Sequence, residues 1–89
     1  MTLLEAIRDL DTFGDHDGIY AAEPWTRDSE CVVVPIGGDH GAAVAQGFCS
    51  FPPVHLLREF VDGWQANVDH ALTAEEKCER LIHYGMFDA

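Results

Sequence analysis

Positive charge is scarce in this sequence. It contains 5 lysine and arginine residues against 16 aspartate and glutamate residues, which gives a formal net charge of −11 at pH 7. Proteins bind nucleic acids and anionic membrane surfaces through clusters of Lys and Arg. The few basic residues of this chain are scattered and form no such cluster. We therefore expect no direct binding of nucleic acid and no binding to a membrane surface.

Long apolar runs and paired cysteines are also missing. No uninterrupted apolar stretch approaches the ~20 residues of a membrane-spanning helix, and the N-terminus lacks the basic start and apolar run of a signal peptide. The three cysteines, Cys31, Cys49 and Cys78, are widely spaced. They do not form the CxxC pairs of a zinc site or a regular disulfide framework. The sequence therefore predicts a cytoplasmic protein with buried thiols.

Catalytic signatures are absent as well. The sequence has no nucleophile elbow and no dinucleotide fingerprint, and its glycine-rich residues 37–41 lack the Lys and Ser/Thr of a phosphate-binding loop. A small metal-dependent enzyme stays an alternative, because carboxylate and imidazole ligands suit Zn²⁺, Mn²⁺ or Fe²⁺. Solvated turn residues explain the same pattern, so we expect no enzyme, no cofactor and no bound metal. The residues concerned are Asp15, His16, Asp17, Asp39 and His40.

Apolar residues, by contrast, are present in ordinary amounts. They make up 47% of the chain, which is typical of globular proteins and unlike disordered acidic chains. A length of 89 residues is enough for one domain with a thin core. We expect residues 1–89 to form a single acidic domain.

Helical patterns occur in three places. Thr2 and Glu5 have the spacing of a capping box, which Thr73 and Glu76 repeat near the C-terminus. Apolar residues follow both boxes at helical spacing, and a third apolar stripe runs from Leu57 through Trp64 to Val68. These patterns predict helices over residues 2–11, 53–68 and 73–85.

Strand patterns lie between the first and second of these helices. Residues 19–22 and 47–51 are short strand candidates, and residues 42–46 are a helical turn or a loop. Residues 31–36 carry continuous β-branched side chains, which indicates a central, largely buried strand. The predicted fold is α+β, in the order α-β-β-β-α-α. In it, a small antiparallel sheet of about three strands packs against three helices on one face.

The two tryptophans have different surroundings. Trp64 lies on the apolar stripe of the second predicted helix and is expected in the core. Trp25 lies in a loop beside Arg27, Asp28 and Glu30. An exposed Trp among charges is typical of a binding hot spot, but Trp25 can equally fold back over the sheet edge. Both alternatives stay open at this point.

In outline, the whole chain resembles a family of small acidic immunity proteins encoded beside polymorphic toxins, including contact-dependent growth-inhibition toxins. The resemblance rests on the amphipathic first helix, a short strand, a valine-rich strand after a charged loop, a third strand and two C-terminal helices. The segments that carry it are residues 3–10, Ile19-Tyr20, residues 31–34, Gly47-Phe48, residues 74–76 and residues 83–88.

The resemblance implies a function without catalysis. Such a protein binds its cognate toxin domain in the cytoplasm and blocks the active site or the substrate path. Many of these toxins are nucleases with basic active sites, which an acidic inhibitor can occupy as an anionic decoy. The net charge points independently to a basic protein partner. A generic acidic adaptor that binds another basic protein is an alternative, and acidity also simply keeps proteins soluble.

We expect partner contacts at acidic turns and at one aromatic residue. Carboxylates contribute mainly to association rate and specificity, and an aromatic anchor contributes mainly to a slow off-rate. The predicted contact residues are Asp11, Asp15, Asp17, Trp25, Asp28, Glu30, Asp39, Glu59 and Asp62.

Overall fold

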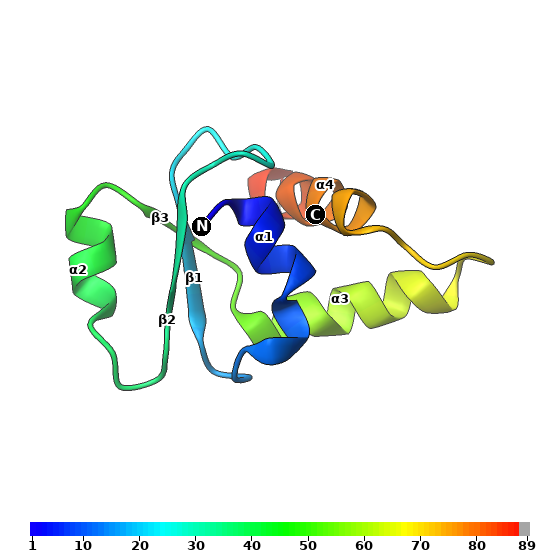
Figure 1. Ribbon diagram of the computed structural model, residues 1–89, viewed down its shortest axis with the longest axis horizontal. Helices are drawn as coiled ribbons and strands as arrows, with labels where there is room; N and C mark the ends of the chain where they lie inside the picture. Colours follow the sequence, from blue (N-terminus) through cyan, green and yellow to red (C-terminus); the bar gives the residue numbers. More distant parts are fainter. Residues whose placement is uncertain (88–89) are drawn as a thin grey trace.

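A three-stranded antiparallel sheet lies at the centre of the computed structural model, which describes residues 1–87 (Figure 1). The elements follow one another as α1 (Leu3–Arg8), a short 3-10 helix η1 (Leu10–Thr12), β1 (Gly18–Ala21), β2 (Cys31–Val34), α2 (His40–Ala45), β3 (Cys49–Phe51), α3 (Val54–Ala66) and α4 (Ala74–Phe87). The α+β class and the three antiparallel strands are confirmed. One helix, α2, is added where the sequence left a helical turn or a loop.

The strand order is β2-β1-β3, so β1 is central. Ile19 lies opposite Val33 and Phe51, whereas Tyr20 lies opposite Val32 and Ser50. Side chains alternate between the faces of a sheet. Ile19 is therefore buried on one face, and Tyr20 points to the other face, where its hydroxyl contacts His40 of α2.

The prediction of residues 31–36 as a central, largely buried strand is wrong. The strand ends at Val34 and forms an edge of the sheet. Only Cys31 is fully buried, and the three valines are half-buried. Val33 packs against the core cluster, and Val32 and Val34, which point to the opposite face of the sheet, are also half-buried, so all three positions are apolar. This continuous apolar pattern does not indicate a neighbouring strand on both sides.

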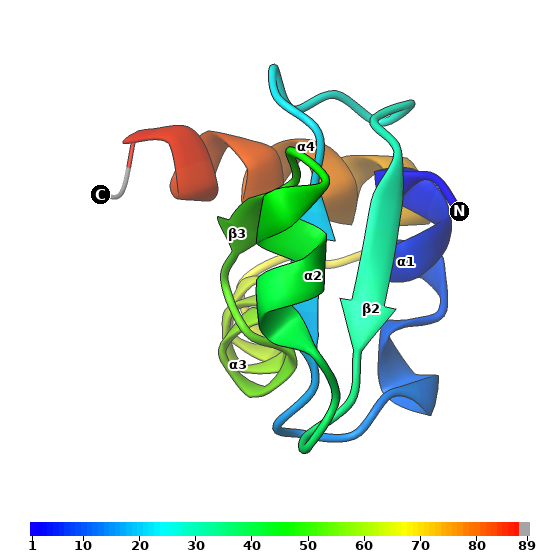
Figure 2. The ribbon, with the colours of Figure 1, turned by 90° about the vertical axis from the view of Figure 1, so that its left-hand side faces the viewer.

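Helices cover the two faces of the sheet unequally. Helices α1, α3 and α4 lie on one face, as the sequence predicted for its three helices, while α2 lies on the other face (Figures 1 and 2). The main core is built between the sheet and these three helices. Its fully buried larger side chains include Leu3, Ile19, Val54, Leu57 and Leu81. Helix α2 buries only Ala43.

Local signals explain the helix ends. The capping box of α1 is present, because Thr2 Oγ1 accepts from the Glu5 N–H and Glu5 Oε1 accepts from the Thr2 N–H, at 3.2 and 2.8 Å. The predicted first helix is shorter than expected and continues as η1. Helix α4 runs two residues past the predicted end, and Asp88 of the last resemblance segment lies outside the described residues. None of the helices within residues 1–87 has the length and apolar content required to cross a bilayer.

Candidate functional site

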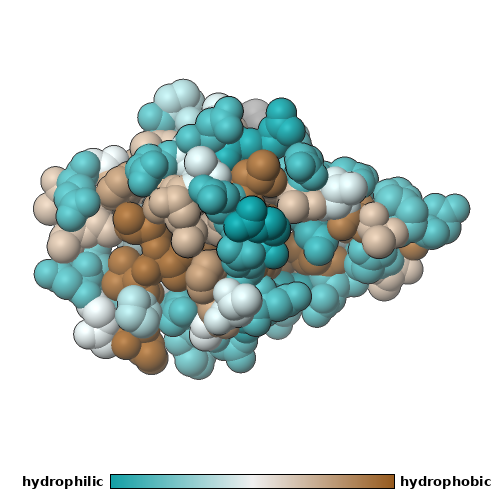
Figure 3. Space-filling view, in the orientation of Figure 1, coloured by the Kyte–Doolittle hydropathy of each residue, from teal (hydrophilic) through white to brown (hydrophobic). Residues whose placement is uncertain are grey.

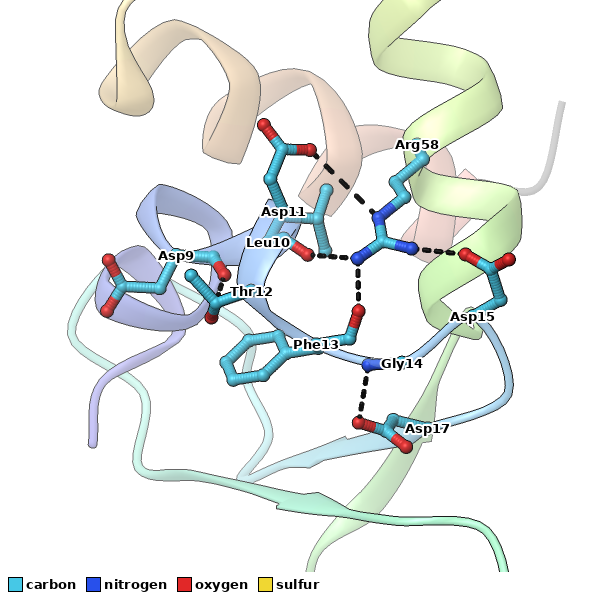
Figure 4. Close-up of polar contacts among 9 residues, drawn as sticks. All are labelled: Asp9, Leu10, Asp11, Thr12, Phe13, Gly14, Asp15, Asp17 and Arg58. Carbon is cyan, nitrogen blue, oxygen red and sulfur yellow. Dashed lines mark hydrogen bonds and ion pairs between the residues drawn. The ribbon is translucent and has the colours of Figure 1, made fainter.

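Three of the predicted contact residues, Asp11, Asp15 and Asp17, lie in one acidic turn, which Arg58 holds to the fold (Figure 4). Arg58 of α3 donates from Nη2 to the carbonyl oxygens of Leu10 and Phe13, and from Nη1 to the Asp15 carboxylate. Its Nε lies 4.0 Å from Asp11 Oδ1. The side chain of Arg58 is only 23% exposed. This guanidinium therefore fastens the connection between α1 and β1 to α3, and two predicted contact residues share an internal counter-charge.

Asp17 completes this turn in a different way. Its carboxylate accepts from the Gly14 N–H at 2.9 Å. That hydrogen bond closes the turn before β1, which is a frequent role of Asp in loops. The contacts of these acidic residues therefore hold the turn in place. The Asp11 side chain is nevertheless fully exposed, and Asp15 is also exposed.

Trp25 is folded back onto the molecule. Its indole Nε1 donates to the Ala21 carbonyl at 3.2 Å, and its ring packs edge to face against Phe51 with centroids 4.9 Å apart. A Cβ placed on Gly85 would lie 2.9 Å from the ring. Trp25 is therefore half-buried and packs between the sheet and α4. Of the two alternatives, the structure supports packing on the sheet edge.

The remaining predicted contact residues are spread over the surface. Asp28 is exposed in the loop before β2, and Glu30 lies 3.4 Å from the N-terminal ammonium. Asp39 caps α2 by accepting from the Ala42 N–H at 3.0 Å. Glu59 and Asp62 are exposed on α3. These carboxylates do not gather in one place, although Asp62 and Asp11 line the same small cleft between α1 and α3.

The residues considered for a metal site lie in different local structures. Asp15 pairs with Arg58, His16 faces the ring of His55 at 6.1 Å, and the His40 Nδ1 lies 2.9 Å from the Tyr20 hydroxyl. Across residues 1–87, no group of three or more His, Cys, Asp or Glu side chains is arranged to hold a metal ion.

Cys31 and Cys78 are buried as predicted, whereas Cys49 is only half-buried. Burial raises the pKa of Cys31 and of Cys78 to about 11. The pKa of Cys49 is also raised, chiefly through its hydrogen bond with Glu23. Because the thiolate is the reactive form of cysteine, raised pKa values keep all three thiols weak nucleophiles at neutral pH.

An open groove between α3 and α4 was not anticipated from the sequence. Its cavity measures about 650 Å³ and is lined by Trp64, Glu79, Arg80, Ile82, His83, Tyr84 and Met86. Phe60 stacks on Trp64 at 5.9 Å and contacts Tyr84 at 4.2 Å between ring centroids. The Arg80 guanidinium lies 5.8 Å from the centre of the Trp64 ring. Met86 is 53% exposed at the rim.

Helical spacing builds this groove. Phe60 and Trp64 are four residues apart on α3, and Arg80 and Tyr84 are four residues apart on α4, so each pair lies on one side of its helix. The sequence assigned Trp64 to the core, because core and interface residues produce the same apolar stripe. The sequence signal that could have revealed the groove is the matching four-residue spacing of Arg80 and Tyr84, since Trp, Tyr, Arg and Met are enriched in protein interfaces.

Most basic side chains already have acidic or aromatic neighbours. Arg8 pairs with Asp9 at 3.1 Å, Arg27 pairs with Glu79 at 3.2 Å, and Arg80 covers Trp64. In the whole chain, 16 aspartate and glutamate residues outnumber 5 lysine and arginine residues roughly threefold. The surface field is therefore negative, and the first turn of α4 adds Glu75 and Glu76 close to the groove-lining Glu79 in sequence.

Comparison of the chain with protein-family models, with curated proteins and with solved structures finds no match.

Proposed function

We propose that this chain is a binding protein without catalytic activity, which neutralises a basic protein partner in the cytoplasm. The partner is the cognate domain of a polymorphic toxin, whose nuclease-type active site or substrate path the chain blocks. The observation that carries the proposal is the open aromatic groove between α3 and α4 on a chain with a net charge of −11. The toxin class comes from the resemblance to small acidic immunity proteins.

The groove has the size and chemistry of a protein contact. Binding cavities range over roughly 300–1,000 Å³, and this one measures about 650 Å³. Residues that dominate binding energy are typically Trp, Tyr and Arg around a desolvated pocket, and Trp64, Tyr84 and Arg80 line this one. An apolar side chain of the partner fits between these residues, and Met86 can adapt its unbranched side chain around it.

Charge determines what kind of partner the groove accepts. Glu79 at the groove pairs with Arg27, and Glu76 caps α4. The acidic excess of the whole chain, together with Glu75 in the preceding turn, therefore attracts lysine and arginine side chains. Opposite fields speed association and disfavour partners of the same charge. A nuclease active site is positively charged because it binds phosphate, so an acidic protein can occupy that surface and exclude the nucleic acid.

Two other functions are alternatives. A generic acidic adaptor would use the same groove and the same field, and it differs only in the partner. A metal-dependent enzyme built on Asp15, His16, Asp39 and His40 has no supporting arrangement within residues 1–87, where these side chains serve in other contacts.

Co-expression tests the proposal. The chain is produced together with the toxin encoded beside its gene, and growth is compared with cells that make the toxin alone. We expect growth to be restored, and the two proteins to co-purify. Continued killing would contradict the toxin assignment. Binding to a different basic protein, without any protection from the toxin, would favour the adaptor.

A further inference from the structure

The outer edge of β2 is only partly paired. The Ala22 N–H donates to the Glu30 carbonyl at 2.9 Å. Bonding alternates along an antiparallel pair, so Val32 and Val34 bond toward β1. The backbone groups of Cys31 and Val33 therefore point away from β1, toward the open edge of the sheet.

The N-terminal residues cover the first part of this edge. The Cys31 N–H donates to the Met1 carbonyl at 2.8 Å, and the Leu3 N–H donates to the Ser29 carbonyl at 2.9 Å. Between them Thr2 forms an antiparallel bridge with Glu30. This beginning of a fourth strand stops opposite Cys31. Within residues 1–87, β1 is the only strand that β2 pairs with, so the Val33 N–H and C=O have no strand beside them.

The open part of the edge is apolar. Ile36 is 72% exposed just after the strand, and the three valines of β2 are half-buried. Figure 3 shows apolar side chains gathered over β2 and over the loop that leads to α2. Exposed sheet edges usually carry a lysine, an inward-pointing charge or a bulge that prevents pairing. Here residues 31–38 contain no charged residue, and only Pro35 limits the edge.

We propose that this edge binds an extended, positively charged segment of the partner protein by strand addition. The segment pairs with the Val33 backbone and places apolar side chains against Ile36. This contact rests on the proposed function and adds a second surface to the groove. Main-chain pairing on a sheet edge is a recurrent mode of peptide recognition.

Charge selects a basic segment over a second copy of this chain. Asp28 and Glu30 precede β2, Asp39 follows it, and residues 28–57 contain no lysine or arginine. Two copies, each with a net charge of −11, would place like charges at both ends of the shared edge. A segment with lysine or arginine beside apolar residues meets Asp28 before the strand and Asp39 after it, while Glu30 already pairs with the N-terminal ammonium.

A short capped peptide of alternating lysine and valine tests this contact with the intact protein. Amide-resolved NMR follows its titration and the exchange of the Val33 N–H. We expect saturating peptide to slow Val33 exchange at least about tenfold, because pairing protects the amide. Two matched peptides should leave Val33 unprotected: one with N-methylated valines, which cannot pair, and one with glutamate in place of lysine.

Two protein variants localise the contact. Ile36→Lys should weaken binding of the lysine–valine peptide about tenfold, which corresponds to about 1.4 kcal/mol. Ala66→Lys adds the same charge at the exposed end of α3, on the opposite side of the molecule (Figure 1), and should change affinity less than about twofold. Unchanged thermal unfolding midpoints show that both variants are folded.

Three outcomes would overturn the contact. These are protection confined to α3 and α4, equal weakening by both variants, or protection of Val33 by self-association at high protein concentration without peptide. The toxin co-expression test separates this inference from the proposed function. Protection from the toxin without peptide pairing removes the strand-addition contact alone, whereas pairing without protection removes the toxin assignment.

Discussion

Helix α3 carries one arginine near its beginning and contacts a second, from α4, toward its end, and the two contacts differ. At its beginning, Arg58 is mostly buried and bonds to the carbonyls of Leu10 and Phe13 and to the Asp15 carboxylate. Toward its end, the exposed Arg80 of α4 lies 5.8 Å from the centre of the Trp64 ring and borders an open cavity. The acidic residues around Arg58 therefore stabilise the fold, and the surface around Arg80 is available to a partner.

Replacing each arginine tests this contrast and should give the largest difference in stability. Arg58→Met leaves two carbonyls without their donor, so we expect the free energy of unfolding to fall by about 2–4 kcal/mol. Arg80→Met keeps an apolar stem on Trp64 and should cost less than about 1 kcal/mol. Urea denaturation measures both values. Equal losses in the two variants would contradict the assignment of separate roles.

Two helical glycines sharpen the contrast at smaller cost. A Cβ on Gly85 of α4 would lie 2.9 Å from Trp25 and 3.4 Å from Phe51, whereas a Cβ on Gly63 of α3 meets nothing within 4 Å. We expect Gly63→Ala to stabilise the protein by about 0.5–1 kcal/mol through helix propensity. Gly85→Ala should instead destabilise it by about 1 kcal/mol, because overpacking outweighs the propensity gain.

Thermal unfolding followed by tryptophan fluorescence measures the stability of both glycine variants. A shift in Trp25 emission is expected only in Gly85→Ala. Stabilisation by both substitutions would show that Trp25 is loosely packed against α4. That result would favour the interpretation of Trp25 as a binding hot spot.

The smallest expected effect concerns the capping box of α4. Hydrogen bonds from the Thr73 backbone and from His70 lower the pKa of Glu76 from 4.5. Its contribution to stability is therefore fully present above pH 4.5 and is lost as the pH falls through the lower folded value. Glu76→Ala should be less stable than the wild type at pH 7, with a deficit that shrinks at acidic pH.

Glu75→Ala is the matched control for the cap, because Glu75 lies in the same turn and accepts no hydrogen bond within residues 1–87. Its effect on the unfolding midpoint should be smaller at pH 7. A deficit of Glu76→Ala that grows toward acidic pH would reverse the expected sign.

Local chemistry explains how much of the fold was predictable. The capping boxes at Thr2 and Thr73 identify the starts of α1 and α4, and both form as predicted. Helix α2 escaped prediction as a firm element because its six residues carry no apolar periodicity, and its N-cap Asp39 was interpreted as turn chemistry. The place of β2 at the edge depends on strand order, which the composition of one strand does not encode.

The candidate site was less predictable for the same reason. An acidic turn that binds a partner and one that binds Arg58 have the same residues in sequence, and only the packing of α3 distinguishes them. Trp64 has the spacing of a core residue, and it borders a groove because α3 and α4 leave open space beside it.

The affinity of the proposed toxin partner for groove variants tests the central claim most directly. Met86→Lys places a positive charge at the groove rim, where Met86 is 53% exposed, and should weaken binding about 30-fold, or about 2 kcal/mol. Val44→Lys makes the same change at a similarly exposed residue of α2, across the sheet, and should bind within about twofold of the wild type. Wild-type affinity in both variants would contradict the account.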